Sequence, residues 1–360
     1  MSNIFEFNNQ IAFHPGYYIK EYIDGIGLTQ EDFAKRLGTT PKNLSYLIRG
    51  EQSLSPEIAL KLSSLIGTSV NYWLNLQSKY DSLKAEFSAE KEKEKERELF
   101  KLIGYKYFKD NFNLPDLPKK IDEQIIELRR FLGVSSLTVF TNKDMYVNFR
   151  GADLKKYDNN IIKANIMVQI ATNLALKELN TPKYNRKKLE QSINYILTLT
   201  DKHDKFYPEV KKVLYEAGVN FIVMPHYEGS KINGACKRIN NHHIMLMVSD
   251  RNTFSDSFWF TLFHELGHII HGDFGVSFID QSGEIEEKAN KYAENKLIPE
   301  KEYKEFIKQN ELNENTIRSF SKKICRDSGI VLGRLQKDGY IKYNDWRFKS
   351  LRCKYTVVFK

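Results

Sequence analysis

The sequence has only three cysteines, Cys236, Cys325 and Cys353, and they are far apart. An odd number of cysteines with no C-x-x-C pair argues against a disulfide framework and against a zinc site made of thiolates. No apolar run approaches the ~18–20 residues that a transmembrane helix needs. The first ten residues contain neither the basic nor the apolar region of a secretion signal. We therefore expect a cytoplasmic protein with no membrane partner.

The N-terminal part of the chain has the pattern of a bundle of short helices. Thr29 is followed by an acidic turn, and Thr40 and Ser55 are each followed by proline, so all three are good N-caps. Gly38 is placed to end the first of these helices. Because the 360 residues leave room for two or three domains, we assign residues 1–78 to a helical domain of their own.

Residues 79–101 separate this domain from the rest of the chain. Between residues 90 and 98 acidic and basic residues alternate, so side chains three positions apart have opposite charge. This pattern predicts a solvated helical spacer. Residues 102–205 follow as a helical connecting region, with helices expected at 121–132 and 160–177, and we find no catalytic motif in it.

Residues 206–310 show a mixed pattern of strands and helices. Short apolar runs at 219–224 and 244–248 predict strands, and the two glycines within 226–239 favour a loop or a hairpin between them. Residues 256–297 return to a helical pattern. The combination predicts an α+β domain around one apolar core.

Residues 311–360 form a basic C-terminal segment. The chain has a net charge of +9, and residues 318–360, with twelve Lys and Arg against three Asp, account for all of this excess. The segment could meet nucleic acid or an acidic surface, or it could only aid solubility, and the sequence leaves both interpretations open. Short strands are expected at 339–343 and 355–359.

The sharpest motif is the sequence HELGH. His264 and His268 are four residues apart, so on a helix both imidazoles lie on one face and can hold one metal ion. Glu265 is rotated away from them and can reach a water bound to that metal without being a ligand itself. Three of the eight histidines lie within 264–271, which argues against a chance match on a core helix.

A catalytic zinc site needs a third protein ligand. His271 and Phe274 stand where the metzincin pattern requires glycine and histidine, so that solution is excluded. A carboxylate from the next helix, which begins near residue 284, is the other solution. Glu286 lies one residue off the apolar stripe expected there and is our first choice, with Glu287 second. His271 is interpreted as a neighbour of the site rather than a ligand.

The expected apolar stripe of that helix consists of Ile285, Ala289, Tyr292 and Ala293.

The stretches GVNFIVMPH (218–226), FWFTLFHELGHIIHG (258–272) and EEKANKYAENKLIP (286–299) resemble the ImmA/IrrE family of zinc metallopeptidases. The resemblance implies a zincin-like domain with a small sheet, in which Zn²⁺ is held by His264, His268 and Glu286. It also implies that Asn290 braces the site. The family usually has phenylalanine where this chain has Tyr292.

Residues 14–78 resemble Xre-type, lambda-repressor-like helix-turn-helix domains, in the version found in HigA-type antitoxins. The resemblance covers HPGYYIKEYI and the stretch from LTQEDFAKRL to VNYWLNLQ. It implies a five-helix bundle that binds double-stranded operator DNA, and we expect a homodimer on two half-sites. The fold class expected for the chain is therefore mainly α, with a helical middle and an α+β C-terminal half.

In such a domain, the second helix of the motif (41–49) enters the major groove and the first (30–37) braces it on the backbone. Asparagine can pair with adenine, and lysine or arginine can meet guanine or phosphate. The residues expected to contact DNA are Gln30, Thr40, Lys42, Asn43, Ser45, Tyr46 and Arg49.

Together the two resemblances imply a DNA-binding transcriptional regulator with its own zinc metallo-endopeptidase of narrow specificity. Its substrate is expected to be a repressor or antitoxin protein, this chain itself included, and Glu265 is expected to be the general base. His271, His243 and Tyr227 are candidates for stabilising the oxyanion. The alternative is a HigA-like antitoxin or repressor whose zinc domain acts as a sensor or scaffold without protease activity. A toxin is a further partner that the sequence leaves open.

Overall fold

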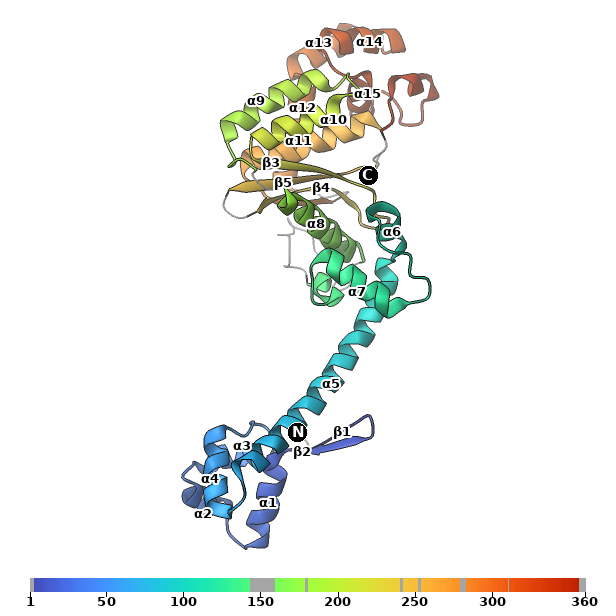
Figure 1. Ribbon diagram of the computed structural model, residues 1–360. Helices are drawn as coiled ribbons and strands as arrows, with labels where there is room; N and C mark the ends of the chain where they lie inside the picture. Colours follow the sequence, from blue (N-terminus) through green and yellow to red (C-terminus); the bar gives the residue numbers. More distant parts are fainter. Residues whose placement is uncertain are drawn as a thin grey trace. The chain divides into compact units, whose positions relative to one another are not determined.

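The computed structural model describes residues 3–142, 159–178, 181–239, 242–251, 254–278, 283–309 and 311–355. The chain divides into two compact units, Met1–Glu96 and Arg97–Lys360, each drawn in Figure 1. The segments expected at 102–205, 206–310 and 311–360 all lie within the second unit, because their side chains share its cores.

The first unit is a helical bundle preceded by a hairpin. Its helices are α1 (Pro15–Gly25), α2 (Gln30–Leu37), α3 (Pro41–Ile48), α4 (Pro56–Ile66) and the first part of α5 (Val70–Ile103). The side chains of Thr29, Thr40 and Ser55 accept hydrogen bonds from the first turns of α2, α3 and α4, which confirms all three predicted N-caps. Buried apolar side chains from all five helices form one core.

The hairpin of β1 (Ile4–Phe7) and β2 (Gln10–Phe13) was not anticipated from the sequence. Asn8 and Asn9 at its tip both have positive φ, as a tight hairpin turn requires, and asparagine tolerates this conformation. Phe5 and Phe7 pack edge-on against Phe87 of α5. The pair of asparagines between two short apolar runs was the available signal.

Helix α5 continues without a break through the predicted spacer, residues 79–101, and confirms that this segment is helical. The expected opposite-charge pairs three residues apart are present, with Lys93 on Glu90 at 3.5 Å and Lys95 on Glu92 at 2.9 Å. The spacer is not solvated throughout, because Glu96 is buried.

The second unit is built on a four-stranded mixed sheet with the order β3-β5-β4-β6. The strands are β3 (Val219–Met224), β4 (Ile232–Ile239), β5 (His243–Ser249) and β6 (Gly275–Phe278). Strands β3 and β5 run parallel, whereas β4 is antiparallel to both β5 and β6. Residues 232–239 are thus a hairpin strand, and the loop predicted at 226–239 is limited to its first part.

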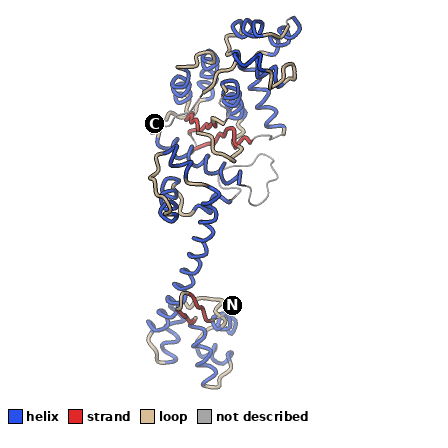
Figure 2. Tube along the Cα trace, turned by 90° about the vertical axis from the view of Figure 1, so that its right-hand side faces the viewer, coloured by secondary structure: helices blue, strands red, loops and turns tan. Residues whose placement is uncertain are grey.

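Helices cover both faces of this sheet (Figures 1 and 2). Ile244, Leu246 and Val248 of β5 face one core, whereas Met245 and Met247 face the other. The single core expected from the sequence is therefore two cores, one on each side of strands that are buried on both faces. The core that contains Leu246 also holds the helix with the HELGH motif.

The helices predicted at 121–132 and 160–177 are confirmed. The helical stretch predicted at 256–297 is wrong in its middle, because Gly275–Phe278 pair with β4 and form β6 at the edge of the sheet. The helices that pack mainly with the Met245 core are α6 (Lys106–Phe112), α7 (Ile121–Leu132) and α8 (Asn159–Lys177). The others are α9 (Arg186–Ile196), α10 (Phe206–Glu216), α11 (Ser255–His271), α12 (Glu284–Leu297), α13 (Glu300–Gln309), α14 (Glu314–Lys323) and α15 (Ser328–Lys337). Short 3₁₀ segments occupy Leu137–Thr141, Leu197–Leu199 and Trp346–Leu351.

The strand predicted at 339–343 is wrong, because these residues form turns after α15. The strand predicted at 355–359 lies almost wholly outside the described residues. Across the described ranges, none of the helices combines the length and apolar character needed to cross a membrane.

Candidate metal centre

The HELGH motif lies in the C-terminal half of α11. This helix packs a continuous apolar side against the sheet, including Trp259, Leu262 and Phe263, which are fully buried. It ends at Gly272, which adopts the left-handed conformation that glycine favours. His264 and His268 are 8% and 0% exposed, so the protein has enclosed two polar rings that need partners.

Helix α12 supplies the third side chain. Glu286 in its first turn is 4% exposed, whereas the neighbouring Glu287 is exposed. The expected apolar stripe is wrong at Ile285, which is 40% exposed. Glu286 takes the inward position instead and shares the buried face of α12 with Ala289 and Ala293, whereas Glu284 and Glu287 of the same turn are exposed.

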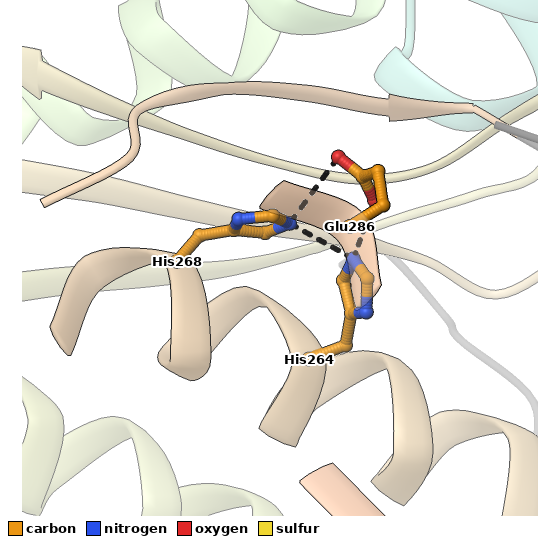
Figure 3. Close-up of side chains that lie close together, drawn as sticks. All are labelled: His264, His268 and Glu286. Atoms are coloured by element: carbon orange, nitrogen blue, oxygen red, sulfur yellow. Dashed lines mark hydrogen bonds and ion pairs between the residues drawn. The ribbon is translucent and has the colours of Figure 1, made fainter. Parts of the chain in front are cut away.

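The three side chains point toward one another (Figure 3). Glu286 Oε2 lies 3.1 Å from His264 Nε2, and Glu286 Oε1 lies 3.5 Å from His268 Nε2. The two Nε2 atoms are 2.9 Å apart. One ligand atom from each residue falls within 4.8 Å of the others, so a single ion could contact all three.

The electrostatics of this cluster reflect the shared contacts. Burial alone lowers the pKa of His264, but its hydrogen bond to Glu286 and the charges of Glu265 and Glu286 raise that pKa above the ordinary value. Burial alone raises the pKa of Glu286, but hydrogen bonds from both histidines hold it far below the usual range. Glu286 is therefore ionised, which is the form that binds a metal.

The donor set fits zinc. Two imidazole nitrogens and one carboxylate are the ligands of many catalytic zinc sites, which keep a further position open. His264 Nδ1 lies 2.9 Å from Asn290 Oδ1, so the N–H at Nδ1 donates a hydrogen bond to this amide oxygen. The other ring nitrogen, Nε2, then faces Glu286 and His268 and is the atom that would bind the metal. His268 Nδ1 is buried and has no hydrogen-bond partner in the described structure. Asn290 is thus placed as the resemblance implied.

Glu265 is fully buried beside the cluster, and neither of its carboxylate oxygens has a hydrogen-bond partner within the described ranges. Strand β4 passes so close that a Cβ atom on Gly234 would lie 2.6 Å from Glu265 Oε1. Only glycine leaves room for the carboxylate there. In the sequence, Gly234 indicated only a loop or a hairpin, although a glycine inside a strand often marks such a close approach.

The three candidates for stabilising the oxyanion, His271, His243 and Tyr227, are not part of the metal cluster. The metal-binding group found in the described part of the chain contains neither His271 nor His243. His271 is exposed and contacts Tyr292 edge-on at 5.8 Å between ring centroids. Tyr227 is excluded as an oxyanion donor, because its hydroxyl is buried and donates to the carbonyl of Ile103 at 2.5 Å.

The residues expected to contact DNA lie together on the surface of α2 and α3. Gln30, Thr40, Lys42 and Asn43 are exposed, and Ser45 and Tyr46 are partly exposed. Arg49 is exposed but engaged, because its guanidinium makes two bonds of 3.0 Å to Glu51 and one of 2.9 Å to Ser45. The charge of Arg49 is therefore offset by a carboxylate two residues away.

The exposed surface of α2 and α3 is typical of a helix-turn-helix regulator, and the metal-binding cluster of α11 and α12 is typical of a metallopeptidase-type domain. A family model described as helix-turn-helix matches residues 19–73, and one described as IrrE N-terminal-like domain matches residues 218–319. The chain belongs to the helix-turn-helix transcriptional regulators and combines their DNA-binding domain with a domain of the IrrE/ImmA-like peptidase family.

Curated relatives match a small share of this chain. The uncharacterized HTH-type transcriptional regulator YddM of Escherichia coli K12 is 39% identical over 72 residues, which are 20% of this chain and 77% of that protein. Virulence-associated protein A' of Dichelobacter nodosus is 42% identical over 69 residues, 19% of this chain and 60% of that protein. Virulence-associated protein I of the same organism is 32% identical over 80 residues, 22% of this chain and 74% of that protein.

Proposed function

We propose that this chain is a transcriptional regulator whose second unit is a zinc-dependent endopeptidase of narrow specificity. The observation that carries the proposal is the convergence of His264, His268 and Glu286 beside the buried carboxylate of Glu265, which has no hydrogen-bond partner among the described residues. A cluster that only stabilised the fold would have no need for a second carboxylate without hydrogen bonds, since burying such a group costs free energy.

Zinc held by His264, His268 and Glu286 would act as a Lewis acid on a peptide carbonyl and lower the pKa of a water molecule. Glu265 takes the proton from the attacking water and passes it to the nitrogen of the leaving amine. Its carboxylate is suited to this because none of the described residues competes for it with a hydrogen bond. Gly234 keeps the space in which the carboxylate lies.

The substrate class we propose is a repressor or antitoxin protein, with this chain itself as one candidate. A helix-turn-helix unit concentrates the attached peptidase near other proteins at the same operator, which favours such targets over bulk proteolysis. Cleavage of the chain at residues 79–101 would first require α5 to unwind, since this segment is helical and a peptidase acts on extended chain.

For the first unit we propose binding to double-stranded operator DNA as a homodimer on two half-sites. The N-terminal half of α3 would read bases through Asn43 and Lys42, and Gln30 would contact the backbone. Lys42 has no ion-pair partner among the described residues, so its charge is available for phosphate or guanine.

The deciding experiment compares cells that express wild type, Glu265→Gln or Glu287→Gln, using proteomics of protein N-termini. New N-termini in one or a few DNA-binding proteins should appear with wild type and with Glu287→Gln, whose side chain is exposed, and should be absent with Glu265→Gln. All three purified proteins should shift the same operator fragment, because Glu265 lies outside the helix-turn-helix unit.

The same comparison tests the alternative function. If wild type generates no new N-termini but still binds its operator and zinc, the second unit is a sensor or scaffold and the protein is an antitoxin-like repressor. Co-purification with a toxin would then be the expected finding.

A further inference from the structure

A pocket opens along the same face of α11 and α12 that carries the metal centre. It has a volume of about 290 Å³ and is lined by Phe260 and Thr261 of α11, Leu297 of α12, and Ile330, Arg334 and Lys337 of α15, among others. Residues 318–360, the basic C-terminal segment, thus supply one of its walls.

The pocket lies next to the metal centre. His264 bonds Asn290 across the two helices, so α11 and α12 are antiparallel neighbours at this level. Phe260 is one turn before His264, and Glu294, which also lines the pocket, is one turn after Asn290. One helical turn is about 5.4 Å, and residues four apart share a face. Asn233 of β4 lines the pocket too and precedes Gly234, the residue against Glu265.

The charged groups of the pocket are paired with each other. Arg352 donates to Asp256 at 2.8 Å, and Arg334 lies 3.1 Å from Glu294 and 2.8 Å from Asp338. Lys337 also pairs with Glu294. Three cations of the basic segment are therefore matched by three carboxylates, although Asp256 Oδ1 and Arg352 Nε have no hydrogen-bond partner in the described residues. Because these six charges balance, a further buried charge would be left uncompensated.

The rest of the lining combines the apolar side chains of Phe260, Leu297 and Ile330 with polar ones such as Asn233, Ser257 and Thr261. A cavity of about 150 Å³ suffices for a benzene ring, so this pocket has room for an aromatic or a long aliphatic side chain. An uncharged occupant would bury apolar surface without breaking the ion pairs.

We propose that this pocket is the specificity subsite of the peptidase, and that it takes a bulky, uncharged side chain of the protein substrate beside the scissile bond. The proposal rests on the function proposed above. It gives the basic C-terminal segment a role in building the substrate site, with Arg334, Lys337 and Arg352 serving as paired wall residues rather than as a nucleic-acid surface.

The test uses a fluorescent decapeptide library with one position fixed in turn as Leu, Phe, Ala, Glu or Lys. Binding is measured to full-length, zinc-loaded Glu265→Gln protein, which cannot complete cleavage. Peptides with fixed Leu or Phe should bind about tenfold or more tightly than those with Ala, Glu or Lys, as burial of one large apolar side chain predicts.

Adding Thr261→Phe, which fills the pocket, should remove this preference while zinc content stays unchanged. Adding Thr198→Phe, the same change at an exposed position outside the pocket, should leave the preference intact. Binding that ignores the fixed residue, a preference that survives Thr261→Phe, or no peptide binding at all would overturn the subsite.

Cleavage of the same library by wild type separates this proposal from the previous one. Selective binding without any cleavage would keep the pocket and overturn the peptidase. Cleavage without selectivity for the fixed residue would keep the peptidase and overturn the pocket.

Discussion

The two units of this chain organise their functional side chains in opposite ways. On α2 and α3, the expected DNA contacts are exposed or partly exposed, and Arg49 finds its partners, Ser45 and Glu51, within four residues in sequence. In the metal centre the side chains are buried, and His264 bonds Asn290 from 26 residues further along the chain. The first surface is made by two helices that follow one another in sequence, whereas the second exists only after two helices and a strand have packed.

The two units should therefore respond differently to substitution. Exposed side chains contribute separately, so substitutions on α3 should have graded effects. Buried polar groups that satisfy one another act as a unit, so a single loss in the metal centre leaves the others without a partner.

The largest effect is expected for the metal ligands. His264→Ala or Glu286→Ala should remove zinc from a protein that otherwise holds about one ion per chain, because each deletes one of three ligands. Mass spectrometry of metal content after dialysis measures this, with Glu287→Ala as the matched control. Zinc retained without Glu286 would mean that another side chain is the third ligand.

The next effect concerns the space beside Glu265. Gly234→Ala would place a Cβ 2.6 Å from Glu265 Oε1 and push the carboxylate out of position. Cleavage should fall roughly 10²-fold or more, the scale of losing a general base. Gly25→Ala, whose new Cβ meets nothing within 4 Å, is the control.

Zinc content should be unchanged in Gly234→Ala, since the three ligands remain. If Gly234→Ala cleaved its substrate at the wild-type rate, the present position of the Glu265 carboxylate would not matter for cleavage.

A smaller effect is expected at Asn290. Asn290→Ala removes the acceptor that orients His264 and should weaken zinc binding by about 10–100-fold, the usual cost of losing such a support. Asn290→Asp keeps an acceptor and should retain most of the affinity. Competition with a chelator measures both, and equal losses in the two variants would argue against the hydrogen bond as the cause.

The smallest effect is expected on the DNA surface, and it has the opposite sign. Glu51→Gln releases Arg49 from its carboxylate partner and should strengthen DNA binding several-fold. The slope of log affinity against log salt should steepen by up to about one, as one added phosphate contact predicts. Fluorescence anisotropy at several salt concentrations measures this.

Glu57→Gln breaks a similar pair, with Lys61 on α4, and serves as the control. An equal gain in both variants would indicate that net charge alone, and not the freed Arg49, improves binding.

The features that could be predicted from the sequence differ between the two units. Capping residues such as Thr29 and Thr40 set the helix starts of the first unit through contacts with their own turns, so the sequence predicted them correctly. The hairpin at Asn8 and Asn9 was missed because strands of four residues carry too few positions to show a period.

In the second unit, the sequence identified the two histidines by their spacing on one helix. It ranked Glu286 above Glu287 but placed the apolar stripe of α12 wrongly at Ile285, because the rotation of a helix about its axis depends on what it packs against. The approach of Gly234 to Glu265 could not be foreseen, since it joins a strand and a helix that are neighbours only in the folded sheet.

The sequence by itself thus determined the helix-turn-helix pattern, the HELGH motif and the basic excess of residues 318–360, because each of these features consists of residues that are close together in the chain. Only the tertiary structure decided that Glu286 turns inward, that Gly234 makes room for Glu265, and that Arg334 and Arg352 pair across a pocket instead of standing free. These outcomes depend on the burial of charges among distant elements, whose cost is set by the packing that surrounds them.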